Sequence, residues 1–160
     1  MSKYQYSLPV LLEMAAAVEE SAGDFYVTLG ERFPRHKDLF NDLAGDEVDH
    51  AKTYTYLLSK MKVEAAEIYS TEEERTQADE NIRVLESTQL VGSLKKGAER
   101  ARTVPDLDSA LKAAVQLEKD TILFYYNLAM VLGSKEHRQD VYKIIMVEHT
   151  HLSRVESLTT

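Results

Sequence analysis

Two short stretches of the chain repeat a carboxylate and an imidazole at the same spacing. Residues 46–50 read DEVDH and residues 147–151 read VEHTH, so Glu47 precedes His50 and Glu148 precedes His151 by three positions. Side chains three positions apart in a helix lie on one face, about one turn apart. Each pair can therefore offer an oxygen and a nitrogen to one metal ion, and this donor set suits iron or manganese.

A glutamate lies in the helix predicted before each pair. Glu19 and Glu118 are each followed seven positions later by a tyrosine, Tyr26 and Tyr125. The segment VEESAGDFYVTL aligns with LEKDTILFYYNL and superimposes Glu19 on Glu118, so the chain is a weak internal repeat of two helical hairpins. Glu20 adjoins Glu19, but the repeat favours Glu19 as the candidate ligand.

Long amphipathic helices must position these residues. The few Pro and Gly residues fall mostly where periodic apolar segments end, and the apolar spacing predicts an all-α, four-helix bundle. The predicted helices run from about residue 8 to 32, from 34 to 61, from a cap at Asp106 or Asp108 to Gly133, and from a cap at Ser134 to the end of the apolar pattern at Leu158.

More than forty residues separate the second predicted helix from the third. This is too long for a turn between antiparallel neighbours, so we predict a crossover. Ser70 and Thr71, each followed three positions later by Glu, resemble a capping box. With the apolar residues between Ile82 and Leu94, they predict one or two short helices there, packed on the bundle or on a partner subunit.

Six polar residues continue the apolar stripes of the four long helices at three- and four-residue steps, so we expect them to point into the bundle. They are Glu19, Glu47, His50, Glu118, Glu148 and His151. Four buried carboxylates cannot all stay ionised without compensation, and these stripes contain no Lys or Arg. Two divalent cations would balance the four charges. Coincidental buried ion pairs are the alternative interpretation.

Composition narrows the classes of protein. The 160 residues fit one domain, which we place at residues 1–160. The absence of Cys excludes disulfides, Cys-bound zinc, iron–sulfur clusters and rubredoxin-type iron. The formal charge of -8 argues against nucleic-acid binding, and the basic stretch KKGAERAR reads as a solvated helix face. Without a bilayer-length apolar run or a signal peptide, we expect a soluble, cytoplasmic protein with no membrane partner.

Several other residues are secondary candidates. Tyr26 and Tyr125, two turns beyond a glutamate, could donate to the ligands or be redox-active, or could simply pack in the core. Asp46 could accept the second ring N–H of a ligand histidine or could be solvated, and its counterpart in the repeat is Val147. The remaining histidines fall off the stripes and are expected at the surface. They are His36, His137 and His149.

With these motifs, the sequence resembles the ferritin-like di-iron superfamily and, within it, the rubrerythrin-like group. The most specific features are the paired Glu19 and Glu118 and the doubled EVDH and EHTH. The resemblance implies that the six stripe residues bind two iron ions, with manganese as an alternative. It also implies that Glu47 and Glu148 differ from the other two glutamates in bridging or chelating mode, without assigning which pair bridges.

The sequence departs from these relatives at identifiable positions. Typical rubrerythrins carry a Cys-rich rubredoxin domain, which this chain lacks, and a further Glu where this chain has Thr121. Bacterioferritins have a haem-binding Met where this chain has Val48. The chain ends nine residues beyond His151, so we expect a small homo-oligomer, with a dimer favoured, in place of a storage shell.

The resemblance implies a non-haem di-iron oxidoreductase that oxidises Fe(II) with dioxygen or hydrogen peroxide, or reduces these oxidants, in protection against oxidative stress. Electrons would come from an external donor such as rubredoxin or a flavoprotein. Two alternatives remain open at this point: a ferroxidase that feeds an iron store, and a structural bundle without redox activity.

Overall fold

The fold is a bundle of long helices, as predicted. The computed structural model describes residues 8–68, 96–132 and 135–159, and these residues form no strand. The elements in chain order are α1 (Leu8–Arg32), the short 3-10 helix η1 (Pro34–His36), α2 (Lys37–Ile68), α5 (Gly97–Thr103), α6 (Leu107–Val131) and α7 (Lys135–Glu156). The prediction of an all-α fold is confirmed.

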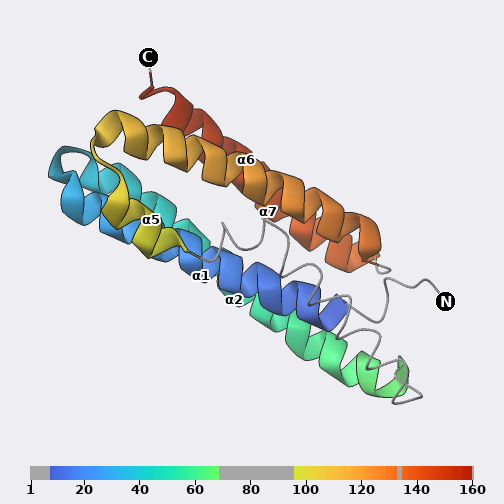
Figure 1. Cartoon of the computed structure of the whole chain (residues 1–160). Coiled ribbons are helices and arrows are strands. Elements are labelled where there is room, and N and C mark those ends of the chain that lie inside the picture. Colours follow the sequence, from blue (N-terminus) through green and yellow to red (C-terminus); the bar gives the residue numbers. More distant parts are fainter. Residues whose placement is uncertain (1–7, 69–95, 133–134, 160) are drawn as a thin grey trace.

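The four long helices form two antiparallel hairpins that pack side by side (Figure 1). In one hairpin α1 packs on α2, and in the other α6 packs on α7, while α1 also contacts α6 and α2 contacts α7. Because α2 and α6 run in the same direction, the chain between them has to return along the bundle (Figure 1). The arrangement is that of a four-helix bundle with a crossover.

The helix boundaries follow the sequence signals closely, with two differences. Asp106 is the N-cap of α6, because its side chain accepts a hydrogen bond from the Ser109 backbone N–H at 2.8 Å. The second helix continues beyond Met61 to Ile68, since the intervening residues include no Pro or Gly to end it. Leu158, predicted to extend the apolar face of the last helix, follows its end and is 36% exposed.

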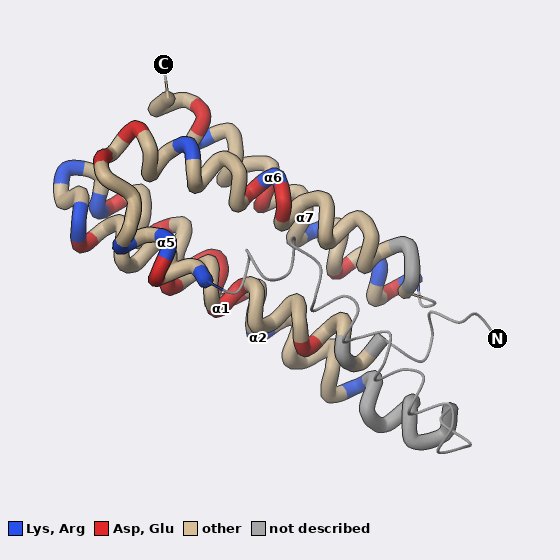
Figure 2. The backbone as a smooth tube through the Cα atoms, viewed as in Figure 1, with Lys and Arg blue, Asp and Glu red and all other residues tan. Residues whose placement is uncertain are grey.

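The described part of the crossover contains one short helix. Helix α5 spans most of the KKGAERAR stretch and packs along α1 (Figure 1). It carries both acidic and basic residues (Figure 2), and its buried Ala101 accepts a hydrogen bond from the Arg32 guanidinium at 2.5 Å. The capping box at Ser70 and the apolar residues 82–94 lie outside the described residues.

Gly97 sets how closely α5 approaches α1. Its N–H donates to the Ser21 hydroxyl at 2.8 Å, and a Cβ added at this position would lie 1.9 Å from the Ser21 carbonyl oxygen. Substitution Gly97→Ala should therefore force the two backbones apart and break this hydrogen bond. We expect unfolding in urea to show a loss of about 2–4 kcal/mol.

Gly45, in the middle of α2, provides the matched control. A Cβ there would meet no atom within 4 Å, so Gly45→Ala is expected to be neutral or to stabilise by about 0.5–1 kcal/mol through the better helix propensity of Ala. Equal stabilities for the Gly97→Ala variant and the wild-type protein would show that α5 does not depend on this close approach.

The interior of the bundle is one continuous hydrophobic core to which all four long helices contribute. Its largest fully buried side chains include Tyr26, Tyr54 and Tyr125. In the described part of the chain, none of the helices has the length and apolar character needed to cross a membrane. The hydroxyl groups of Tyr26 and Tyr125 donate hydrogen bonds to buried carboxylates at the centre of the bundle.

Candidate metal centre

The four long helices each deliver a glutamate to the middle of the bundle, and all four glutamates are at most 1% exposed. Acidic residues occur in the middle portions of these helices (Figure 2). Two buried histidines, one from α2 and one from α7, join them. The structure thus brings together all six residues that the stripes predicted: Glu19, Glu47, His50, Glu118, Glu148 and His151.

These six residues form two overlapping groups, and within each group the potential ligand atoms lie within 4.8 Å of one another. One group contains Glu19 and His50, and the other contains Glu118 and His151. Glu47 and Glu148 belong to both. Glu47 and Glu148 therefore lie between the two groups, whereas Glu19 and Glu118 each belong to one group only.

Each shared carboxylate directs one oxygen to each histidine. Glu148 Oε1 lies 2.9 Å from His50 Nδ1, while Glu148 Oε2 lies 3.0 Å from His151 Nδ1. Glu47 Oε2 lies 3.2 Å from His50 Nδ1, and its Oε1 lies 3.5 Å from His151 Nδ1. This is the disposition that would let one carboxylate contact two adjacent cations.

The donor atoms of the first group converge on a common point. Glu19 Oε2, Glu47 Oε2 and Glu148 Oε1 all lie within 3.6 Å of His50 Nδ1, yet Glu19 Oε2 and Glu148 Oε1 are buried without a hydrogen-bond partner in the described structure. The short distance from Glu148 Oε1 to His50 Nδ1 is thus not matched by hydrogen-bond geometry. Buried oxygens without partners are costly, and a cation among them would satisfy them.

The outer glutamates are each held by a tyrosine of the opposite hairpin. The Tyr26 hydroxyl on α1 donates to Glu118 Oε1 on α6, and the Tyr125 hydroxyl on α6 donates to Glu19 Oε1 on α1. One oxygen of each carboxylate is thereby fixed, and the other faces the histidines. The two tyrosines act as hydrogen-bond donors across the bundle, a relationship invisible within either helix alone.

Two further buried hydroxyl groups lie on the same stripes, and neither was predicted from the sequence to take part in the site. Tyr54, one turn after His50, stacks in a tilted arrangement on Tyr125 with ring centroids 5.0 Å apart. Thr121 follows Glu118 by one turn. Neither hydroxyl has a hydrogen-bond partner in the part of the chain that the structure describes. Their places on the ligand stripes were the signal that could have identified them.

Burial and the neighbouring charges shift the pKa values of several ionisable groups in the cluster. Burial, together with the charges of neighbouring carboxylates, raises the pKa of Glu19 and of Glu118 well above their usual values. Burial acts against ionisation of Glu148 too, but the close contacts of its two oxygens with the imidazoles of His151 and His50 outweigh burial and lower the pKa of Glu148 to about 2. Burial opposes protonation of the imidazoles, yet their hydrogen bonds to carboxylates raise the pKa of His50 to about 12 and that of His151 to about 10.

Proton release on metal binding tests this charge arrangement. Both histidine pKa values lie above 7, so both imidazoles are protonated at neutral pH without metal, whereas a metal ligand must present an unprotonated lone pair. Binding of two divalent ions at pH 7 should therefore release about two or more protons, and the affinity should rise with pH. Isothermal titration calorimetry in buffers of different ionisation enthalpy counts these protons, and a count of zero would contradict the assignment.

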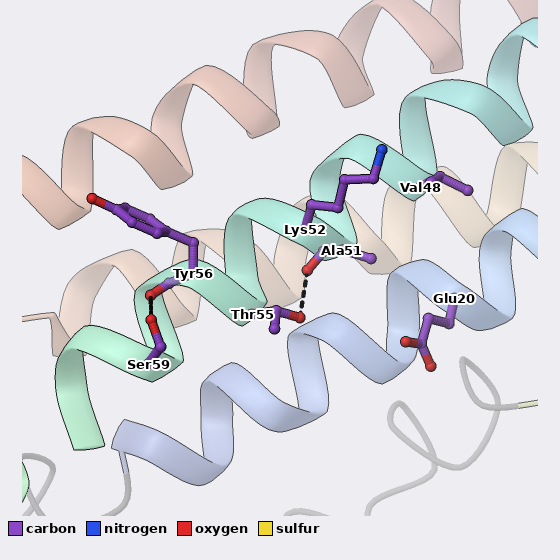
Figure 3. A pocket seen from close by; sticks show the side chains of 7 residues that line it. All are labelled: Glu20, Val48, Ala51, Lys52, Thr55, Tyr56 and Ser59. Atoms are coloured by element: carbon purple, nitrogen blue, oxygen red, sulfur yellow. Dashed lines mark hydrogen bonds between the residues drawn. The ribbon is translucent and has the colours of Figure 1, made fainter. Parts of the chain in front are cut away.

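Glu20 faces away from the cluster, as the repeat indicated. It is exposed and lines a groove on the outside of α1 and α2, with a cavity of about 480 Å³, together with residues of α2 such as Val48 and Tyr56 (Figure 3). None of the six clustered residues lines this groove. The choice of Glu19 over Glu20 thus agrees with the geometry.

The three histidines outside the cluster differ in their exposure to solvent. His149 is exposed and lies edge-on to Tyr126, and His36 is half-buried against Phe40. His137, expected at the surface, is only 7% exposed, so that prediction was wrong. It lies one turn before Val141 and therefore continues the buried stripe of α7.

The sequence of the chain matches the Rubrerythrin family over residues 11–159, a range that covers nearly all of both hairpins and contains all six clustered residues. Neither the curated proteins nor the solved structures gave a match. With the bundle and the buried carboxylate–histidine cluster, the match confirms the predicted family resemblance: the chain belongs to the rubrerythrin family.

Proposed function

We propose that the protein is a non-haem di-iron oxidoreductase that oxidises Fe(II) with dioxygen or hydrogen peroxide, or reduces these oxidants, in protection against oxidative stress. The observation that carries the proposal is the pair of four-residue groups that share Glu47 and Glu148. Two iron ions held there would supply two electrons to one oxidant molecule. Manganese shares these ligand preferences and could occupy the same groups.

The protein's own residues would hold the ions and keep their surroundings dry. Glu47 and Glu148 would hold both ions, and the tyrosine hydroxyls fix the orientation of Glu19 and Glu118. The cluster is enclosed by core side chains, because five of its six members are at most 1% exposed and His50 is 7% exposed. Such enclosure limits the competition of water for the coordination positions.

Repeated turnover would need a supply of electrons. The chain contains no Cys and hence no Cys-bound redox centre of its own. We therefore propose a separate donor, a rubredoxin or a flavoprotein, together with a small homo-oligomeric state in which a dimer is favoured. A single turnover of the proposed chemistry requires neither the donor nor a particular oligomeric state.

Single-turnover kinetics test the proposed chemistry. Wild-type protein is loaded anaerobically with Fe(II) and mixed with dioxygen or with hydrogen peroxide, while the near-ultraviolet absorbance of the Fe(III) product is followed. Wild-type protein should react faster than the Glu148→Ala variant by about two orders of magnitude or more, the usual consequence of losing a metal ligand interaction.

Glu20→Ala is the matched control, because it removes an exposed glutamate next to Glu19 that is not part of the cluster. It should react like the wild-type protein. If the wild-type protein reacts no faster than Glu148→Ala with either oxidant, the redox proposal is wrong.

A further inference from the structure

The two histidines of the cluster differ in the contacts made by the ring nitrogen Nε2. His151 Nε2, the ring nitrogen that points away from the cluster, lies 3.1 Å from Asp46 Oδ2. In the described part of the chain, the hydrogen bonds and ion pairs of His50 all involve Nδ1, and its Nε2 has no carboxylate partner. The difference is notable because the rest of the site is nearly two-fold symmetric.

The internal repeat identifies the cause of this asymmetry. Asp46 immediately precedes Glu47, and the residue that immediately precedes Glu148 is Val147. Asp46 on α2 reaches His151 on α7, and Asp42 on α2 pairs with Arg154 on α7 at 3.2 Å. Continued by one turn, this antiparallel register pairs His50 with Val147, the residue that corresponds to Asp46 in the repeat.

The contacts of the outer glutamates with tyrosines and of the histidines with the shared carboxylates are similar at the two positions. Each outer glutamate accepts a hydrogen bond from one tyrosine, and each histidine faces the same two shared carboxylates. The two histidines also differ in burial. The His151 side chain, which contacts Asp46, is 1% exposed, and the His50 side chain is 9% exposed. Both differences favour the position next to His151.

A carboxylate that accepts the outer N–H of a ligand histidine has two effects on the metal. It fixes the ring orientation and tautomer so that the inner nitrogen presents its lone pair, and it adds negative charge that makes that nitrogen a stronger donor. Loss of such a partner typically costs about 10–100-fold in metal affinity. Asp46 should therefore strengthen one position of the pair only.

We propose that the two positions are unequal in affinity: the ion held by Glu118 and His151 is bound tightly, and the ion held by Glu19 and His50 is bound weakly and exchanges, because Val147 stands in place of an acidic residue. Asp46 is thus a positioning residue for one ion. This inference rests on the proposed dinuclear function. It identifies the His50 position as the one through which Fe(II) would be exchanged.

Cobalt titration of the full chain tests the inequality without relying on catalysis. Co(II) stays divalent under anaerobic conditions, and its visible d–d absorption reports binding alongside calorimetry. Wild-type protein should bind in two steps whose dissociation constants differ by about 10–100-fold. His151→Ala should remove the tight step, and His50→Ala should remove the weak step.

Two substitutions with matched controls isolate the proposed cause. Asp46→Ala should weaken the tight step by about 10–100-fold, and Val147→Asp should tighten the weak step by a similar factor. Asp49→Ala removes an equal charge from the same helix, where Asp49 pairs with Lys52 at 2.8 Å, and should leave both steps unchanged. Val147→Asn adds a polar group of similar size without charge and should change the weak step less than Val147→Asp does.

The outcomes separate the two proposals. Two equal steps in the wild-type protein, or loss of the tight step in His50→Ala, would overturn the inequality while leaving the dinuclear site intact. No effect of Asp46→Ala beyond that of Asp49→Ala would overturn the role of Asp46. Failure of the wild-type protein to bind any Co(II) would overturn both this inference and the proposed function.

Discussion

Glu148→Ala should weaken the binding of both metal ions, whereas Glu118→Ala should weaken only one. Glu148 directs Oε1 to His50 and Oε2 to His151, so its removal takes one oxygen from each group together with a negative charge that the two groups share. Glu118 belongs to one group only. Loss of a carboxylate that compensates a buried cation is costly, because the low-dielectric interior offers no substitute.

Equilibrium dialysis with elemental analysis measures this difference directly. At a free Co(II) concentration that fills the wild-type protein with about two ions per chain, Glu148→Ala should retain almost none and Glu118→Ala about one. Glu148→Gln keeps the size of the side chain but not its charge, so it separates a loss of ligation from a loss of packing. Far-ultraviolet circular dichroism should show helical content in all variants. Equal losses of metal in Glu118→Ala and Glu148→Ala would contradict the shared position of Glu148.

Metal loading should also raise the unfolding temperature by about 10–20 °C. Each group takes ligands from both hairpins. In the group around His50, for example, Glu19, Glu47 and His50 come from the α1–α2 hairpin and Glu148 comes from the α6–α7 hairpin. The unfolded chain cannot present this constellation, so binding stabilises the folded state. At a free concentration 100 times the dissociation constant, each site contributes about 2.7 kcal/mol. For a chain of this size, each kcal/mol shifts the midpoint by about 2–4 °C.

Thermal unfolding followed by circular dichroism checks this expectation, with Mn(II) as a redox-stable ion and with EDTA as the metal-free reference. The shift should largely disappear in Glu148→Ala and persist in Glu20→Ala. An identical midpoint with Mn(II) and with EDTA would indicate that the groups do not bind this ion in the folded protein.

The local part of the site was readable from the sequence, because it depends on helix periodicity. Glu47 and His50 continue the stripe of one helix, and the same spacing recurs at Glu148 and His151. Once four helices with buried polar faces are recognised, their meeting at the bundle centre follows from burial alone. The bounds of α1 and the cap at Asp106 were equally local, since each depends on residues within one or two turns.

Relationships between helices were not readable in this way. Tyr26 shares a helix with Glu19 but donates to Glu118, and which carboxylates are shared depends on how the hairpins rotate against each other. The error at His137 had a different source. His137 lies one turn before the buried Val141 and shares its face of α7, so its burial depends on how far the apolar stripe extends toward the start of the helix.

The crosswise exchange of tyrosine contacts has an evolutionary consequence. Each hairpin brings one outer glutamate, one Glu-x-x-His pair and one tyrosine that donates to the opposite hairpin. Two identical copies of a single hairpin, related by a two-fold axis, would reproduce the same set of six ligands and both tyrosine contacts. Duplication and fusion of an ancestral half-length gene would preserve the centre and would allow the two halves to change independently. Divergence of the two halves after such a fusion would account for Asp46 and Val147 at equivalent positions of the repeat.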